Sequence, residues 1–261
     1  MSAVSPNVAV MIKAIEKASR SLVRDFGEVE KLQISMKGPG DFVSKADKRS
    51  EEIIIDTLQQ DRPEWGILAE EGGAIKGSDT RYRWIVDPLD GTTNFLHGLP
   101  HWAVTIALEK DGEVIAGVIY DPIRQEMFRA EKGGGAFSNR TRLRVSPRNK
   151  PQDLLVVING SQPTEQPASV IEAIYKNNCS ARISGAATLD LAYLAAARCD
   201  VTYLTAVTKP WDVAAGFLMV KEAGGVVTGL DLKPPVFDAR GFLAANPALH
   251  TAFAGIFGLS K

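Results

Sequence analysis

Apolar residues repeat at helical spacing near the start of the chain. Ser5-Pro6 is a favourable helix start, because proline suits the first helical position. The apolar stripe that follows comprises Val8, Met11, Ile12, Ile15, Leu22 and Phe26. This period of three to four residues predicts an amphipathic helix with one face against a core.

A second helix is predicted over about residues 44–60. Ile54 and Leu58 lie on one face of it, and the helical period places Asp47 and Glu51 on that same face. A carboxylate at Asp47 would then point toward the interior. The helix dipole alone also favours an acid in the first turn, which is the simpler interpretation.

Short β-type runs follow without helices between them. The predicted strands are residues 65–69, 82–86, 102–108, 114–120 and 125–130. Asp111-Gly112 between two of them is a strong hairpin signal. Consecutive strands of this kind predict an antiparallel sheet. Residues 1–145 are therefore predicted as an α+β domain in which two helices precede a meander.

The pattern changes after a polar connection at residues 145–153. The predicted strands are then residues 154–158, 181–184, 201–204 and 225–228, and the predicted helices are residues 169–176, 188–198 and 211–223. Alternating strands and helices predict a layered α/β domain over residues 146–261.

Composition narrows the class of protein. The 261 residues suffice for a large core. The net charge of −1 means that the molecule as a whole does not attract polyanions electrostatically. Cys179 and Cys199 show neither a disulfide framework nor a metal-binding spacing, so two reduced, buried thiols are predicted. With no secretory signal and no apolar run of roughly 20 residues, we expect a cytoplasmic protein that does not bind membranes.

Candidate chemistry concentrates at residues 84–95, where an apolar strand ends in two carboxylates. Asp87 and Asp90 are three residues apart, and Pro88 stiffens the space between them. Such carboxylates can hold hard cations such as Mg²⁺, although a simple tight turn explains them equally well. Gly91-Thr92-Thr93 offers backbone amides at the predicted start of a short helix, which suits a phosphate. Together they indicate metal-assisted phosphoryl chemistry.

Three further acidic features could complete such a site. They are Glu70-Glu71 after a predicted strand, Asp47, and Asp212 at the start of a helix rich in small residues. Taken singly, they are explained as a solvated turn and helix-opening acids. Taken together, they could hold two or three divalent cations, with Asp87 as the bridging ligand and the Leu89 carbonyl as a neutral one.

Other catalytic classes lack their signatures. The chain has no Gly-x4-Gly-Lys-Ser/Thr loop and no Gly-x-Ser-x-Gly elbow. His97, His101 and His250 do not have the spacing of a zinc site. Gly133-Gly134-Gly135 lacks a dinucleotide fingerprint, so it predicts a loop.

These motifs resemble the inositol monophosphatase family of lithium-sensitive, magnesium-dependent phosphatases. Asp87-Pro-Leu-Asp-Gly-Thr-Thr-Asn matches its first signature and Trp211-Asp212-Val-Ala-Ala-Gly its second. Glu70-Glu71 and Ser44-Lys-Ala-Asp47 fall in the expected order, and the bacterial extragenic suppressor branch is the most similar. The resemblance implies a layered α-β-α-β-α sandwich, which combines α+β and α/β patterns, and a homodimer.

The resemblance also implies a set of metal ligands. Glu70, Asp87 and the Leu89 carbonyl would hold one Mg²⁺. Asp87, Asp90 and Asp212 would hold a second, and a third, weaker Mg²⁺ would rest on Glu70 and water.

Catalytic roles follow in the same way. Water near Glu70, oriented by Asp47 and Thr92, would attack phosphorus directly without a phosphoenzyme. The implied substrate-binding residues are Asp90, Gly91, Thr92, Gly185, Ala186, Ala187, Thr205 and Asp212.

Two of these positions depart from the family's inositol-binding pattern. Ala186 stands where serine or threonine is usual, and Thr205 stands where an acid is common. A neutral hydroxyl accepts hydrogen bonds less strongly than a carboxylate. The expected substrate is a small phosphorylated alcohol, by default inositol 1-phosphate. Histidinol phosphate, a nucleotide 2′- or 3′-phosphate and a sugar phosphate are the alternatives.

A rival function rests on a basic segment at residues 124–150. Its cations are Arg124, Arg129, Lys132, Arg140, Arg142, Arg144, Arg148 and Lys150. Such a segment could contact RNA or the transcription machinery, a role that some bacterial members of the family are thought to have. The simpler interpretation is an exposed strand face, because Arg140-Thr-Arg142-Leu-Arg144 has a period of two.

Overall fold

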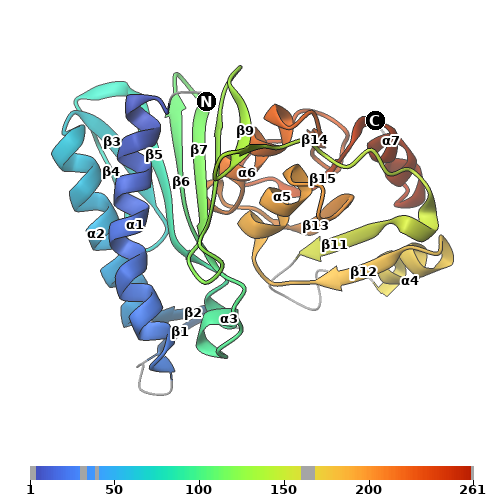
Figure 1. The fold of residues 1–261 in the computed structure, drawn as a ribbon, viewed down its shortest axis with the longest axis horizontal. Helices are drawn as coiled ribbons and strands as arrows, with labels where there is room; N and C mark the ends of the chain where they lie inside the picture. Colours follow the sequence, from blue (N-terminus) through green and yellow to red (C-terminus); the bar gives the residue numbers. More distant parts are fainter. Residues whose placement is uncertain (1–3, 30–33, 39–40, 160–167, 260–261) are drawn as a thin grey trace.

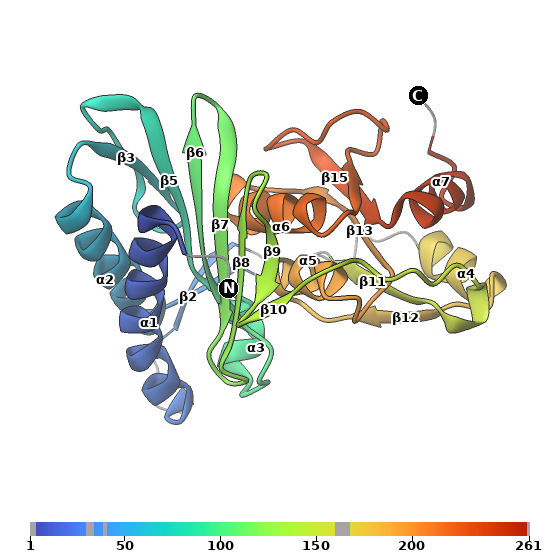
Figure 2. The ribbon, with the colours of Figure 1, turned by 45° about the horizontal axis from the view of Figure 1, so that its top comes forward.

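The computed structural model describes residues 4–29, 34–38, 41–159 and 168–259. They form five layers, α-β-α-β-α (Figure 1), as the resemblance predicts. Helices α1 (Pro6–Phe26) and α2 (Lys45–Asp61) cover one face of an eight-stranded sheet. Helices α5 (Ala187–Ala195) and α6 (Pro210–Glu222) lie between the two sheets (Figure 2). Helices α4 (Ala168–Lys176) and α7 (Pro247–Ile256) cover the outer face of a five-stranded sheet.

The eight-stranded sheet has the order β10-β9-β8-β7-β6-β5-β3-β4. Its strands are β3 (Trp65–Ala69), β4 (Gly73–Ile75), β5 (Asp79–Asp90), β6 (Ala103–Lys110), β7 (Glu113–Asp121), β8 (Glu126–Glu131), β9 (Gly135–Ser138) and β10 (Thr141–Arg142). Asp111 and Gly112 both have positive φ, 51° and 81°, so the predicted hairpin between β6 and β7 is confirmed.

The prediction of a purely antiparallel sheet is wrong for one pair of strands. β3 and β5 run parallel, with Ile67 opposite Trp84. The short edge strand β4 pairs antiparallel with β3 and reverses the chain once more. β5 then passes to the other side of β3 in the same direction as β3. The three residues of β4 carry no alternating pattern, which is why sequence periodicity missed this reversal.

The five-stranded sheet has the order β12-β11-β13-β15-β14. Its strands are β11 (Leu155–Asn159), β12 (Ser180–Ile183), β13 (Val201–Val207), β14 (Val226–Thr228) and β15 (Arg240–Ala245). β11 is parallel to both β12 and β13, whereas β15 is antiparallel to its neighbours. Strand β15 and helix α7 were not predicted, although Asn246-Pro247 is a cap and helix-start signal. The Asn246 side chain accepts from the Leu249 amide at 2.9 Å.

Close packing fixes the start of α6 between the sheets. A Cβ on Gly117 of β7 would lie 2.8 Å from the Ala215 Cα, and one on Gly216 would lie 2.5 Å from Leu191 Cδ1. Only glycine permits these approaches, so α6 packs directly against both β7 and α5. The first turn of α6, which carries Asp212, is thereby held against the eight-stranded sheet.

The first helix is confirmed, with Ser5 Oγ accepting from the Val8 amide at 3.3 Å. Val8, Met11, Ile15 and Leu22 of its apolar stripe are buried, and Ile12 and Phe26 are partly buried. Helix α5 ends at Ala195 rather than at residue 198, because Ala197 is left-handed with φ 59°. Cys179 and Cys199 are free and buried, as predicted. Within the described ranges, no helix has the length and apolarity needed to cross a membrane.

The remaining elements are short. They are the hairpin β1 (Ile34–Gly38) and β2 (Asp41–Ser44), helix α3 (Thr92–Leu96) and the 3₁₀ turn at Pro151–Asp153. Helix α3 is the short helix that the Gly91-Thr92-Thr93 sequence predicts.

Candidate active site

Asp87 and Asp90 lie on β5, which continues through Asp90 instead of ending at residue 86. Asp87 is opposite Thr105 of β6 and Asp90 is opposite Ala103, so β5 holds one extra residue between them. This bulge falls at Pro88-Leu89, where proline has no N–H to donate to the neighbouring strand. The Leu89 amide donates to Asp87 Oδ1 at 2.9 Å. The acid pair is therefore part of a bulged strand and not a free turn.

Gly91 and Thr92 follow the bulge directly. Gly91 has φ 89°, and a Cβ there would lie 3.0 Å from the His101 carbonyl oxygen, so glycine is required on two counts. Thr92 begins α3, and its Oγ1 donates to the Leu89 carbonyl at 3.0 Å. The predicted phosphate-binding amides thus lie beside the acid pair. The predicted neutral ligand, the Leu89 carbonyl, already accepts one hydrogen bond and has a second lone pair.

Glu70-Glu71 follows β3, and the Glu70 amide donates to the Val86 carbonyl at 3.2 Å. This bond places the Glu70 turn next to the end of β5. The turn is held from α2, because the Glu51 carboxylate accepts from the Glu71 amide at 2.9 Å and from the Gly72 amide at 2.7 Å. Glu51 is 4% exposed. Sequence periodicity placed it on the inward face of α2 but assigned it no part in the site.

Asp47 and Asp212 approach from two helices. Asp47, in the first turn of α2, is only 1% exposed, as its position on the apolar face predicts. Asp212 is in the first turn of α6, where its Oδ2 accepts from the Lys209 amide at 2.8 Å. The helix-opening interpretation of Asp212 is thus correct, but its carboxylate also belongs to the acidic cluster described next.

The four carboxyls of Glu70, Asp87, Asp90 and Asp212 form one electrostatic cluster. Burial, followed by the charge of Asp212, raises the pKa of Glu70 to about 8, while a side-chain hydrogen bond with Asp87 lowers it. Burial raises the pKa of Asp87 well above its ordinary value, and the charges of the other three and of Asp47 add to this. Residues 142 positions apart in the sequence therefore share one site.

The other two acids have the same primary cause. Burial raises the pKa of Asp90 to about 6, against the hydrogen bonds from Thr188 that lower it. Burial raises the pKa of Asp212 to about 7, against the lowering effect of the Lys209 amide bond.

The donor set of the acidic cluster fits a divalent cation. Buried carboxylates that repel one another need a counter-charge, and hard oxygen donors suit Mg²⁺. Within the described part of the chain, no three acidic, histidine or cysteine side chains are already arranged as a ligand group. The interaction of Glu70 with Asp87 lowers the pKa of Glu70, against the larger effect of burial.

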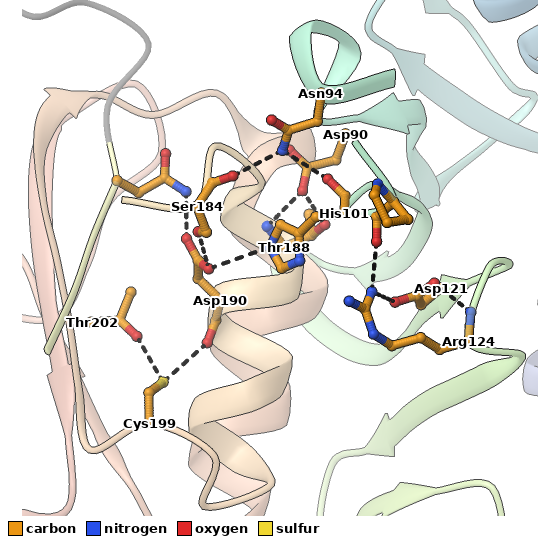
Figure 3. Close-up of polar contacts among 12 residues, drawn as sticks. Asp90, Asn94, His101, Asp121, Arg124, Ser184, Thr188, Asp190, Cys199 and Thr202 are labelled. Atoms are coloured by element: carbon orange, nitrogen blue, oxygen red, sulfur yellow. Dashed lines mark hydrogen bonds and ion pairs between the residues drawn. The ribbon is translucent and has the colours of Figure 1, made fainter. Parts of the chain in front are cut away.

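The segment Gly185-Ala186-Ala187 joins β12 to α5 and lies against the phosphate-binding turn. A Cβ on Gly91 would be 3.3 Å from the Ala186 Cβ. The Asn94 side-chain amide donates at 2.8 Å to both the His101 and the Ser184 carbonyl oxygens (Figure 3). The segment is thus tied to α3, a link that sequence reasoning missed.

Thr205 is in a different setting from the other candidate residues. It lies on β13, is 5% exposed, and its carbonyl oxygen accepts from Arg240 Nε at 3.1 Å. The register of β13 with β15 shifts between Leu204 and Val207. The structure thus gives the backbone of Thr205 a partner on β15, and the substrate role of its side chain stays a prediction.

The layered fold and the acidic cluster together define the class of protein. The sequence model of the Inositol monophosphatase family matches residues 3–258, and the chain belongs to this family.

Individual relatives carry two kinds of name. An "Inositol-1-monophosphatase" of Mesorhizobium japonicum is 47% identical over 248 residues, covering 93% of this chain and 92% of the relative. A "Nus factor SuhB" of Vibrio cholerae is 39% identical over 246 residues, with 93% and 92% covered. Among solved structures, an extragenic suppressor protein suhB from Bartonella henselae has a TM-score of 0.93 at 44% identity, covering 97% of this chain and 98% of that one.

Proposed function

We propose that this protein is a magnesium-dependent phosphomonoesterase that hydrolyses a small phosphorylated alcohol, with inositol 1-phosphate as the default substrate. The observation that carries the proposal is the acidic cluster, built from β3, β5 and α6 and adjoining Gly91-Thr92. Two relatives named for inositol-1-phosphate chemistry cover more than nine-tenths of the chain. A cytoplasmic homodimer and sensitivity to lithium belong to the same proposal.

Two to three ions would share the acidic cluster. Glu70, Asp87 and the Leu89 carbonyl would hold one, Asp87, Asp90 and Asp212 a second, and Glu70 with water a third. When bound, such ions polarise phosphate oxygens and lower the pKa of water.

The chain's own residues would position the reactants. The amides of Gly91 and Thr92 would bind phosphate oxygens, because they are backbone donors at the edge of the cluster. Glu70 would accept a proton from the attacking water, and Asp47 and Thr92 would orient that water. No covalent intermediate is needed, because the water would attack phosphorus directly. The ester P–O bond would break, and the alcohol would leave after its oxygen takes a proton from solvent.

The alcohol part of the substrate would contact Gly185-Ala186-Ala187, which lies against Gly91. Ala186 offers no hydroxyl there. Thr205 offers no charge where an acid would grip sugar hydroxyls strongly. Histidinol phosphate, a nucleotide 2′- or 3′-phosphate or a sugar phosphate therefore remain substrates to be compared with inositol 1-phosphate.

Phosphate release from a panel of these phosphomonoesters tests the proposal. At least one of them should be hydrolysed in Mg²⁺, with the rate falling by about 10²-fold or more in EDTA, because both water activation and charge stabilisation are lost. Added lithium should inhibit the Mg²⁺-dependent rate. Equal rates with and without EDTA would contradict the proposal.

A nucleic-acid function is the second candidate, favoured by the exposed arginines of residues 140–144. Several cations of the basic segment are neutralised, since Arg124 pairs with Asp121 at 2.9 Å and Arg148 with Asp200 at 3.2 Å. Among the residues that the structure describes, however, no ion pair involves Arg140 or Arg144. Exposed arginines suit contacts with phosphate groups, so RNA is the partner to test. Several relatives carry the name "Nus factor SuhB".

If these arginines bind RNA, affinity should fall steeply with salt. Replacing Arg140, Arg142 and Arg144 together by glutamine should reduce the slope of log K against log salt by about two or three. Phosphate release should not change, because none of the three belongs to the acidic cluster. A flat titration at low salt would eliminate RNA as the partner.

A further inference from the structure

Thr188 makes an unusual pair of contacts with Asp90. Its backbone amide donates to Asp90 Oδ2 at 2.9 Å, and its side-chain hydroxyl donates to the same oxygen (Figure 3). Thr188 is fully buried and lies in the first turn of α5. Asp90 is 98 positions earlier, at the end of β5. One carboxylate oxygen is thus held by two donors from another layer of the fold.

Asp90 also supplies what α5 lacks. The N-cap residue of α5 is Ala186, which has no side chain able to accept from the first amides. Asp90 accepts from the Thr188 amide in its place. The amide bond alone would satisfy this capping requirement, so the hydroxyl bond is additional to it.

The segment that carries Thr188 is itself anchored. Asp190, two residues further along α5, is 2% exposed and accepts from Asn159 Nδ2 at 2.7 Å and from the Ser184 hydroxyl (Figure 3). Ser184 in turn holds Asn94 through its carbonyl oxygen. Thr188 therefore donates from a fixed position, because both sides of it are tied by buried hydrogen bonds.

Two donors on Oδ2 fix the rotation of the Asp90 carboxylate and leave Oδ1 outside this pair of bonds. We propose that Thr188 is a positioning residue, whose hydroxyl orients Asp90 as a ligand for a divalent cation. The inference rests on the proposed function. Thr188 would contact neither the cation nor the substrate, but would hold the ligand Asp90 in position. Residues that hydrogen-bond to metal ligands in this way commonly set metal affinity.

Four variants distinguish an orienting role of the Thr188 hydroxyl from a merely structural one. Thr188→Val keeps the shape and the amide bond but removes the hydroxyl, and Thr188→Ser keeps the hydroxyl. Thr57→Val is the matched control, because Thr57 is equally buried and its hydroxyl donates to the Ile53 carbonyl at 2.8 Å, within α2. Thr188→Ala, which also lacks the hydroxyl, gives an independent repeat should the valine variant fold poorly.

Calorimetric titration of the metal-free protein with Mn²⁺, without substrate, is the direct readout. Thr188→Val and Thr188→Ala should bind Mn²⁺ about 10- to 100-fold more weakly than the native protein. Thr188→Ser and Thr57→Val should bind within about threefold of it. The Mg²⁺ concentration for half-maximal phosphate release should rise in parallel for the two hydroxyl-free variants, with kcat at saturating Mg²⁺ changing much less.

Native Mn²⁺ affinity in both hydroxyl-free variants would overturn the inference, as would equal weakening in Thr57→Val or failure of the serine variant to restore binding. Failure of the proposed function is distinguishable from these results. In that case the native protein itself would bind no Mn²⁺ at the acidic cluster and release no phosphate.

Discussion

Replacing Asp212 by asparagine is expected to lower Mg²⁺-dependent phosphate release by about 10³-fold or more while making the metal-free protein more stable. Activity should fall because the acidic cluster loses one charge and one ligand. Removal of a single hydrogen-bond donor to a transition-state charge already costs about 10²–10³-fold in other enzymes. Stability should rise because burial raises the pKa of Asp212 to about 7, so its ionisation at higher pH opposes folding. Asparagine keeps an oxygen that can accept from the Lys209 amide.

The gain should be at least about 1 kcal/mol near pH 8, which corresponds to about 2–4 °C in Tm for a chain of this size. Asp56→Asn is the matched control, since Asp56 is exposed on α2 outside the cluster. It should change neither quantity. An Asp212→Asn variant that turns over at the native rate would contradict the ligand assignment. A variant that loses activity and stability together would contradict the expected gain in stability.

The second large effect is a pH dependence of stability that Mg²⁺ suppresses. Asp90, Asp212 and Glu70 have ordinary pKa values of 3.8, 3.8 and 4.5, and folding raises them to about 6, about 7 and about 8. At a pH between the ordinary pKa values of these groups and their values in the folded protein, the folded protein binds more protons than the unfolded chain. The free energy of unfolding must then decrease as pH rises.

Thermal unfolding of the metal-free protein should therefore occur at a Tm about 5 °C or more lower near pH 8 than near pH 5. Excess Mg²⁺ should raise the Tm mainly at the higher pH, because ions and protons compete for the same carboxylates. Unfolding followed by circular dichroism in EDTA and in Mg²⁺ measures both effects. Parallel pH profiles in the two conditions would mean that the cation does not bind these acids.

Local features of the fold were predictable because they depend on neighbouring residues. The apolar stripe from Val8 to Leu22 and the Ser5-Pro6 cap specify α1. Asp111-Gly112 specifies the hairpin between β6 and β7, because both residues tolerate positive φ. The same local logic, applied to the acid pair and glycine at residues 87–91, located the acids now found together.

Features that depend on distant partners were not predictable from periodicity. The parallel pairing of β3 with β5 follows from the three-residue edge strand β4, which has too few positions to show a pattern. The Thr188 hydroxyl donates to Asp90, 98 positions away. The Glu51 carboxylate accepts from the Gly72 amide, 21 positions away. Thr188 looks ordinary in sequence, because hydroxyl residues are common at helix starts. Glu51 looks ordinary because acids are common on helix faces.

A crystal structure of the protein soaked in Mn²⁺, with anomalous difference maps at the manganese edge, would show whether the acidic cluster holds divalent cations. The proposed metal site predicts anomalous peaks in contact with the carboxylate oxygens of Asp87, Asp90 and Asp212. Well-ordered carboxylates at these three positions with no anomalous peak among them would contradict it.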